Sequence, residues 1–357
     1  LDRLARMSLD LSGDLVTLFR DVVDVESVSG NERRLADLVE QALRVYSHLH
    51  VRRDGDTVIA RTELGRPERV VIAGHLDTVP VAENLPSRLV GDRVYGRGTA
   101  DMKGGVAVAL ACAAALTAPR RDVTWVFYDH EEVEAERNSL TRIARENPQW
   151  LTGDFAVLME PTGAVVEGGC QGTLRFRITT TGLAAHSARS WLGHNAIHEA
   201  GDVLDRLAGY VPREVEVEGL TYREGLNAVA ISGGIANNVV PDRCTVTVNF
   251  RFAPDRDEAD ARAHCQSVFE DYQLEFVDSA PAARPGLDQP IAADFVAAVG
   301  GTPRAKFGWT DVARFSGLGL PAVNYGPADP GKAHADDEFC PVEDLIACRD
   351  ALLRWLS

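Results

Sequence analysis

Cysteine is scarce in this sequence, with six residues among 357. None of them forms a CxxC pair or follows the regular spacing of a disulfide framework, and most lie within apolar runs. This pattern argues against a disulfide-stapled secreted domain and favours reduced thiols in a cytoplasm.

Positive charge is also in deficit. The 37 lysines and arginines stand against 53 aspartates and glutamates, which gives a formal net charge of −16. Because nucleic acids and anionic membranes repel an acidic protein, neither is an expected partner. A small anionic substrate stays compatible with this charge, provided that metal ions or a few arginines create a local cationic pocket.

Long hydrophobic runs are absent as well. No stretch approaches the length of a membrane span, and no apolar signal-peptide core follows the arginines near the start. We therefore expect a cytoplasmic protein without a membrane partner, and Met7 is a candidate native start. Low-complexity tracts and repeats are missing too, and 45% hydrophobic with 25% charged residues is typical of a folded globular protein.

Apolar strands and amphipathic helices alternate through the first half of the chain. Apolar residues recur at helical spacing over residues 12–25 and 31–46. Strands are expected over 57–62, 69–75, 122–129 and 154–160, with helices over 103–118 and 136–147. This order predicts an α/β domain with a central mixed sheet.

A different pattern begins near residue 173. Strands and helices follow there in the order β-α-β-β-α-β, which predicts an inserted α+β unit of the ferredoxin-like type over 173–285. After a linker rich in Pro and Ala at 279–286, a final helix is expected over 342–356. We therefore expect residues 1–172 and 286–357 to form the catalytic domain.

Three of the expected strands have metal-binding residue types at or just after their last residue. In an α/β sheet, ligand sites gather where strands end at their carboxyl side. A carboxylate before the helix over 103–118 and a histidine on a late loop are expected to join them. The candidates are His75, Asp101, Glu131, Glu132, Glu160 and His334.

The gathering of these side chains is what favours a metal site. A lone His or Glu at a strand end is more often a hydrogen-bonded structural residue, but several carboxylates at one edge repel unless protons or cations neutralise them. Imidazoles and carboxylates without cysteine suit Zn²⁺, Co²⁺ or Mn²⁺ in a catalytic site. Five ligands exceed what one open zinc takes, so we expect two metals sharing one carboxylate. Of Glu131 and Glu132, one would then be a ligand and the other a general base.

Six motifs in this order resemble the M20 family of dinuclear zinc hydrolases. They are GHLDTVP, GRGTADMKGG, DHEEVEA, MEPT, GLAAHSA and KAHADDE. The resemblance implies one zinc on His75, Asp101 and Glu160 and another on Asp101, Glu132 and His334, with Asp101 bridging. It also implies Glu131 as general base and acid, Asp77 as the carboxylate that orients His75, and a cis peptide between Asp101 and Met102.

The inserted unit resembles the family's lid or dimerisation domain, so the resemblance implies a homodimer. His186 matches a histidine that stabilises the oxyanion, in the family from the partner subunit. Alternatively, His186 is an ordinary surface residue and Arg251 pairs with a neighbouring acid. The implied substrate contacts are Asn237 or Asn238, Arg251, Thr310 and Gly326. Where many relatives carry an arginine pair, this chain has Cys170 and Gln171, which leaves the acyl group open.

Further motifs, among them CQGTL, TYREGLNAV and NYGPADP, are most similar to the desuccinylase branch of the family. This similarity implies cleavage of a small N-acylated amino acid, N-succinyl-LL-2,6-diaminopimelate, into succinate and LL-2,6-diaminopimelate, in lysine and diaminopimelate biosynthesis. The alternative is another M20 activity, such as acetylornithine deacetylase, N-acyl-amino-acid deacylase or dipeptidase. More distant alternatives are a non-catalytic binding protein and a metal-free hydrolase with two carboxylates.

Overall fold

The structure is a computed structural model of the chain, and it describes residues 8–357. The candidate start at Met7 lies outside these residues. Backbone contacts divide the chain into two compact units. The first unit runs up to Gly168 and includes Pro285–Arg304 and Arg314–Ser357, while the second comprises Gly169–Arg284 and Ala305–Ala313.

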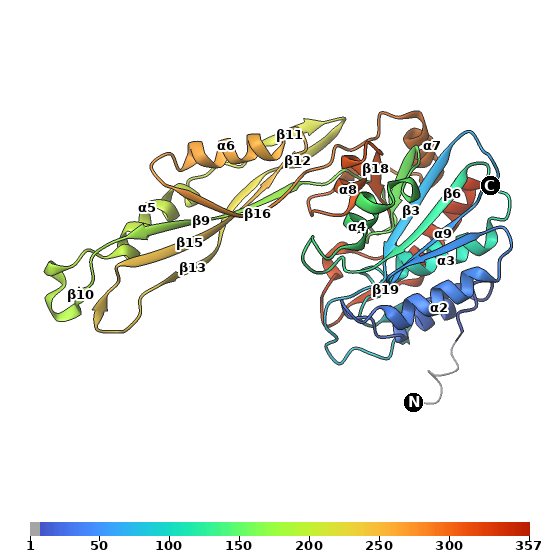
Figure 1. Cartoon of the computed structure of the whole chain (residues 1–357), viewed down its shortest axis with the longest axis horizontal. Coiled ribbons are helices and arrows are strands. Elements are labelled where there is room, and N and C mark those ends of the chain that lie inside the picture. The colour runs from blue at the N-terminus through green and yellow to red at the C-terminus, as the bar shows by residue number, and fades with distance from the viewer. Residues whose placement is uncertain (1–7) are drawn as a thin grey trace. The chain divides into compact units, whose positions relative to one another are not determined.

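A mixed β-sheet of eight strands forms the centre of the first unit (Figure 1). Its order is β1-β2-β6-β3-β7-β18-β8-β17. The strands are β1 (His50–Asp54), β2 (Thr57–Arg61), β3 (Arg69–His75), β6 (Asp122–Tyr128), β7 (Phe155–Leu158), β8 (Glu167–Gly168), β17 (Arg304–Ala305) and β18 (Ala322–Asn324). Strand β3 pairs in parallel with β6 and β7, whereas β2 pairs antiparallel with β6. The expected α/β fold with a central mixed sheet is confirmed.

Helix α3 (Lys103–Ala115) is buried because its sequence is apolar on all sides. It contacts β3 and packs against helices α1 (Leu15–Asp24) and α9 (Val342–Leu356). Gly105 allows a close approach at its start, since a Cβ there would lie 2.2 Å from the main-chain oxygen of Met159. The first unit also contains helices α2 (Arg33–Arg44), α4 (Ser139–Glu146) and α7 (Pro290–Val299), and helix α8 (Val312–Gly317) enters it from the second unit.

A small antiparallel sheet brings two distant loops of the first unit together. It consists of β4 (Arg88–Val90), β5 (Arg93–Tyr95) and β19 (Phe339–Pro341). Tyr95 pairs with Phe339 in this sheet. The loop that leads from β5 to α3 therefore lies beside the loop that enters β19.

The second unit is built on a four-stranded antiparallel sheet in the order β13-β15-β9-β16. Its strands are β9 (Gly172–Thr181), β13 (Gly225–Gly233), β15 (Arg243–Phe252) and β16 (Leu274–Ala280). Helices α5 (Ala196–Ala208) and α6 (Glu258–Val268) contribute to its apolar core. This β-α-β-β-α-β order is the expected one. Two short pairs add to it, β11 (Glu214–Val217) with β12 (Leu220–Arg223) and β10 (Ala185–His186) with β14 (Val239–Val240).

The segment Ala305–Ala313 belongs to the second unit, although the sequence pattern assigned it to the catalytic domain. Two hydrogen bonds account for its position. The Trp309 indole N–H donates to the main-chain oxygen of Pro281 at 3.0 Å, and the Cys170 thiol donates to that of Thr310 at 3.7 Å. Contacts between side chains and backbone of this kind leave no periodic signal in the sequence.

Candidate metal centre

Strand register places three of the candidate ligand segments at one edge of the central sheet. His75 pairs with Tyr128 of β6, so the residues that follow Tyr128 leave the sheet beside His75. Ala73 pairs with Leu158 of β7, and both His75 and Glu160 lie two residues beyond that pair. His75 is fully buried and Glu160 is 5% exposed.

Asp101 lies between the two candidate histidines. Its Oδ1 is 3.0 Å from Nε2 of His75, and its Oδ2 is 3.5 Å from Nε2 of His334. The Asp101–Met102 peptide is cis, as the resemblance implied. Each carboxylate oxygen of Asp101 thus faces a different imidazole, which is the arrangement that a bridging carboxylate requires.

Glu132 completes a group on the side of His334. Its Oε1 lies 3.0 Å from Nε2 of His334. Among residues 8–357, three groups could hold a metal ion, and the ligand atoms within each lie within 4.8 Å of one another. The groups are His75, Asp101 and Glu160; Asp101, Glu132 and His334; and His75, Glu131 and Glu132. The first two share Asp101.

The donor set fits divalent cations. Nδ1 of His75 lies 2.9 Å from the main-chain oxygen of Asp77 and donates its proton there. Nε2, which faces Asp101, is then the nitrogen that can bind a metal ion once it has lost its own proton. Two ligands on a tetrahedral zinc, each bonded at about 2.0 Å, are separated by about 3.3 Å. The observed separations of 3.0 and 3.5 Å lie on either side of this value.

Protons neutralise these carboxylates when no cation does. Burial alone lowers the pKa of His75, but its hydrogen bond to Asp101 and the nearby carboxylate charges outweigh burial and raise the pKa well above its ordinary value. Hydrogen bonds to Asp101 and Glu132 raise the pKa of His334 to about 10. Since the pKa values of both imidazoles are raised, protons and cations compete for the site.

Asp77 has contacts that sequence reasoning missed. Its carboxylate accepts the main-chain N–H groups of Glu131 and Glu132, each at 3.0 Å, and the hydroxyl of Ser29 at 2.7 Å. The same carboxylate lies 3.6 Å from Nδ1 of His75. Asp77 therefore anchors the backbone of both glutamates as well as lying beside the histidine, and no local sequence signal indicates this link.

The other substrate-contact candidates fall into two groups within the second unit. His186 pairs with Val239, and the main-chain oxygen of Asn238 accepts the N–H of Ser187 at 2.8 Å, so His186, Asn237 and Asn238 lie together. Arg251 pairs with Thr173 near the opposite end of β15. From Arg243 to Arg251 the strand extends about 26 Å at 3.3 Å per residue.

Arg251 has no ion-pair partner among the residues that the structure describes. Burial and the charge of Arg175 lower the pKa of its guanidinium, and the more weakly acting charge of Asp278 raises it. Thr310, also in the second unit, is 5% exposed. A partly buried arginine of this kind suits an incoming carboxylate.

Gly326 contacts the backbone next to Glu160. A Cβ at Gly326 would lie 2.3 Å from the main-chain oxygen of Met159 and 2.6 Å from that of Glu160. Its N–H donates to the Thr162 hydroxyl at 3.1 Å. Close packing against the Glu160 segment is therefore sufficient to require a glycine here.

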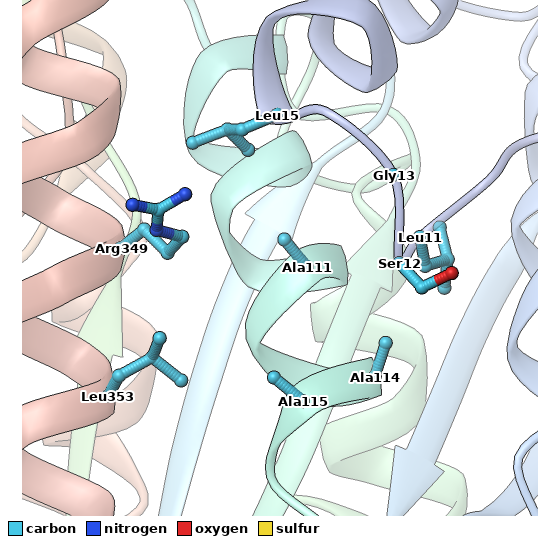
Figure 2. A pocket seen from close by; sticks show the side chains of 9 residues that line it. All are labelled: Leu11, Ser12, Gly13, Leu15, Ala111, Ala114, Ala115, Arg349 and Leu353. Atoms are coloured by element: carbon cyan, nitrogen blue, oxygen red, sulfur yellow. The ribbon is translucent and has the colours of Figure 1, made fainter.

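A cavity of about 320 Å³ lies apart from these groups, toward the other end of helix α3 (Figure 2). From Lys103 to Ala111 the helix rises about 12 Å. The lining residues are Leu11, Ser12, Gly13, Leu15, Ala111, Ala114, Ala115, Arg349 and Leu353. The lining contains neither histidine nor a carboxylate, so this cavity offers none of the metal-binding groups.

Comparison with known proteins decides the family. Residues 71–357 match the model of peptidase family M20/M25/M40. The chain belongs to this family. The match spans every candidate metal ligand, and the resemblance drawn from the six motifs is confirmed.

Two relatives in this family cover nearly the whole chain. A Mycobacterium tuberculosis protein provisionally named succinyl-diaminopimelate desuccinylase is 55% identical, over 98% of this chain and 99% of its own. The succinyl-diaminopimelate desuccinylase of Corynebacterium glutamicum is 46% identical, over 98% of both chains. Among solved structures, a Bacillus subtilis protein described as a dinuclear metal-binding peptidase of the M20 family shares the fold, with a TM-score of 0.68, 16% identity and 96% coverage of both chains.

No helix among residues 8–357 is both long enough and apolar enough to cross a lipid bilayer.

Proposed function

We propose that this M20 protein hydrolyses N-succinyl-LL-2,6-diaminopimelate to succinate and LL-2,6-diaminopimelate. The identities of 55% and 46% to proteins named for this activity, over nearly the full chains, support the substrate. The observation that carries the chemistry is the position of Asp101, whose two carboxylate oxygens each face a different histidine.

Two zinc ions, for which Co²⁺ or Mn²⁺ could substitute, would be held by the groups that share Asp101. One group is His75, Asp101 and Glu160, and the other is Asp101, Glu132 and His334. When bound, such ions acidify water and polarise the scissile carbonyl. Asp77 supports the site by fixing the backbone of the two glutamates.

Glu131 moves the proton in this reaction. Its carboxylate takes a proton from the attacking water, whose oxygen forms a bond to the succinyl carbonyl carbon. The bond between that carbon and the nitrogen of diaminopimelate then breaks, and Glu131 delivers the proton to the departing amine. Succinate and a free amine leave, and the carboxylate of Glu131 is restored.

We also propose a homodimer in which His186 serves the active site of a second copy. Within one copy, the group around His186 and the end of β15 with Arg251 are separated by about 26 Å of strand, too far for both to contact one small substrate. Val229 and Ile231, on the edge strand β13, are 57% and 51% exposed. Exposed apolar residues on an edge strand favour pairing with another chain.

The substrate's carboxylates would be bound in the second unit. Arg251 of one copy supplies a cation, and Thr310 of the same copy supplies a polar group. Asn237 and Asn238 lie with His186, so we expect them to contact the substrate of the second copy. Gly326 would offer only its backbone. We expect the enzyme in a cytoplasm, because all six cysteines are free and buried, as thiols of a reducing compartment are.

Steady-state kinetics on a panel of N-acylated substrates tests this proposal. The panel contains N-succinyl-LL-2,6-diaminopimelate, N-acetylornithine and a dipeptide, each measured with native, chelated and zinc-restored protein. We expect the highest kcat/KM on the succinylated compound, loss of activity on chelation and recovery with zinc. Preference for another substrate would refute the assignment of the acyl group, and activity unaffected by chelation would refute the metal-dependent mechanism.

A further inference from the structure

We propose that the buried ion pair between Arg97 and Glu338 is a positioning device that holds Asp101 at the spacing two cations require. This inference rests on the proposed function, because it assigns a role toward the same metal site. Neither residue was named as a candidate site residue from the sequence. Both are buried, with Arg97 3% and Glu338 1% exposed.

Both carboxylate oxygens of Glu338 accept hydrogen bonds from the segment that carries Asp101. Oε1 accepts the main-chain N–H groups of Ala100 at 2.8 Å and Asp101 at 3.1 Å. Oε2 accepts the N–H of Gly98 at 3.0 Å and Nη1 of Arg97 at 3.0 Å. Four donors therefore converge on one carboxylate, and one of them is the backbone of the shared ligand itself.

Arg97 extends the same device to two other loops of the site. Its Nε donates to the main-chain oxygen of Pro80 at 3.0 Å, in the loop that follows His75. Its Nη1 donates to that of Ala335 at 3.2 Å, next to His334. The pair thus joins the loop that follows His75 to the loops that carry Asp101 and His334.

Stability alone does not account for this ion pair. Removing two charges from water is costly, and buried ion pairs are often no better for stability than apolar residues of the same volume. A fully hydrogen-bonded carboxylate does, however, fix the position of the backbone groups that it contacts. The contact made by Glu338 lies at the N–H of Asp101, so a shift there moves both carboxylate oxygens that face the histidines.

The substitution Glu338→Gln tests the proposal with little change in shape. Whichever carboxylate oxygen becomes the amide NH₂, two N–H donors then meet another donor instead of an acceptor. We expect the Asp101 segment to shift and zinc affinity at the shared site to fall by about 10- to 100-fold. In the cobalt-loaded protein the visible absorption bands should change, and kcat should fall more than KM rises.

The control is Asp337→Asn on the same loop. Asp337 is exposed and pairs with Lys332 at 2.8 Å. This change therefore removes a negative charge next to Glu338 and leaves the Glu338 carboxylate, with its bonds to residues 97–101, unaltered. We expect wild-type zinc affinity and cobalt absorption from it. If Glu338→Gln does not fold, as judged by circular dichroism, Arg97→Lys is measured in the same way and should weaken zinc binding.

Wild-type zinc affinity and cobalt absorption in folded Glu338→Gln would overturn the inference, even if its melting temperature fell. The same result in Arg97→Lys would overturn it where Glu338→Gln does not fold. Failure of the wild-type protein to bind zinc is a different outcome, because it would refute the proposed function and this inference with it.

Discussion

Replacing Glu131 and Glu132 one at a time separates a proton carrier from a metal ligand. The two residues are neighbours, and Asp77 holds both of their main-chain N–H groups at 3.0 Å, so the backbone is fixed in the same way for each. Their side chains differ in contacts, since Glu132 lies 3.0 Å from Nε2 of His334 and belongs to the group that shares Asp101. Glu131 belongs to the group with His75 and Glu132 only.

For Glu131→Gln we expect kcat to fall by about 100- to 10,000-fold, the usual contribution of a general acid and base. This corresponds to about 2.7 to 5.4 kcal/mol in the activation barrier. Glutamine keeps the shape of the side chain but cannot take the proton from water. KM and bound zinc should stay near their wild-type values, because neither depends on this proton transfer.

For Glu132→Gln we expect zinc to be lost from the group with Asp101 and His334, with activity lost in consequence. The assay combines the release of free amine from the succinylated substrate with zinc analysis of desalted protein. Glu134→Gln is the matched control, since Glu134 is exposed on the same segment. Our reasoning fails if Glu131→Gln retains activity within about threefold of wild type, or if it loses zinc as Glu132→Gln does.

Four further predictions concern the rest of the protein. Zinc binding to the metal-free protein at pH 7.5 should release protons, because the pKa of His334 is about 10 without a cation. Titration calorimetry in buffers of different ionisation enthalpy measures the number of protons released, and a value of zero would contradict the prediction. In the metal-free protein the raised pKa of His334 stabilises the fold fully below about pH 6.5, so the urea midpoint should fall as pH rises through about 10. Gly326→Ala should lower the free energy of unfolding by about 1 to 3 kcal/mol in a urea titration, because the new Cβ would meet the main-chain oxygen of Met159. Gly201 has open space around it, so Gly201→Ala should not lower the free energy of unfolding in the same titration. Arg251→Met should raise KM by about tenfold or more without loss of zinc, and Arg177→Met on the exposed face of β9 should leave KM unchanged.

Most of the fold could be predicted from the sequence because its long elements have a clear period. The runs of β3, β6 and β7 are continuous apolar segments, and helix α9 matches its expected range of 342–356. The short strands were not predicted. The three-residue strands β5 and β19 are too short to show an alternation of their own, and the four-residue strands β11 and β12 alternate over only two periods.

The candidate ligands at strand ends could be predicted for the same reason, since the ends of parallel strands meet at one edge of a sheet. Glu338 could not. It ends the run ADDE, which looks like an exposed acidic loop, yet its carboxylate is buried against residues 98–101. Its burial arises from the pairing of β5 with β19, which joins segments more than 200 residues apart in the chain. The contact of Asp77 with the backbone of Glu131 is likewise a tertiary contact without a local signal.

Anomalous diffraction at the zinc absorption edge, from crystals of the zinc-loaded protein, tests the central claim most directly. We predict two peaks about 3.5 to 4 Å apart on either side of Asp101, one bound by His75 and Glu160 and the other by Glu132 and His334. A single peak, or peaks that do not share Asp101 as a ligand, would contradict the account.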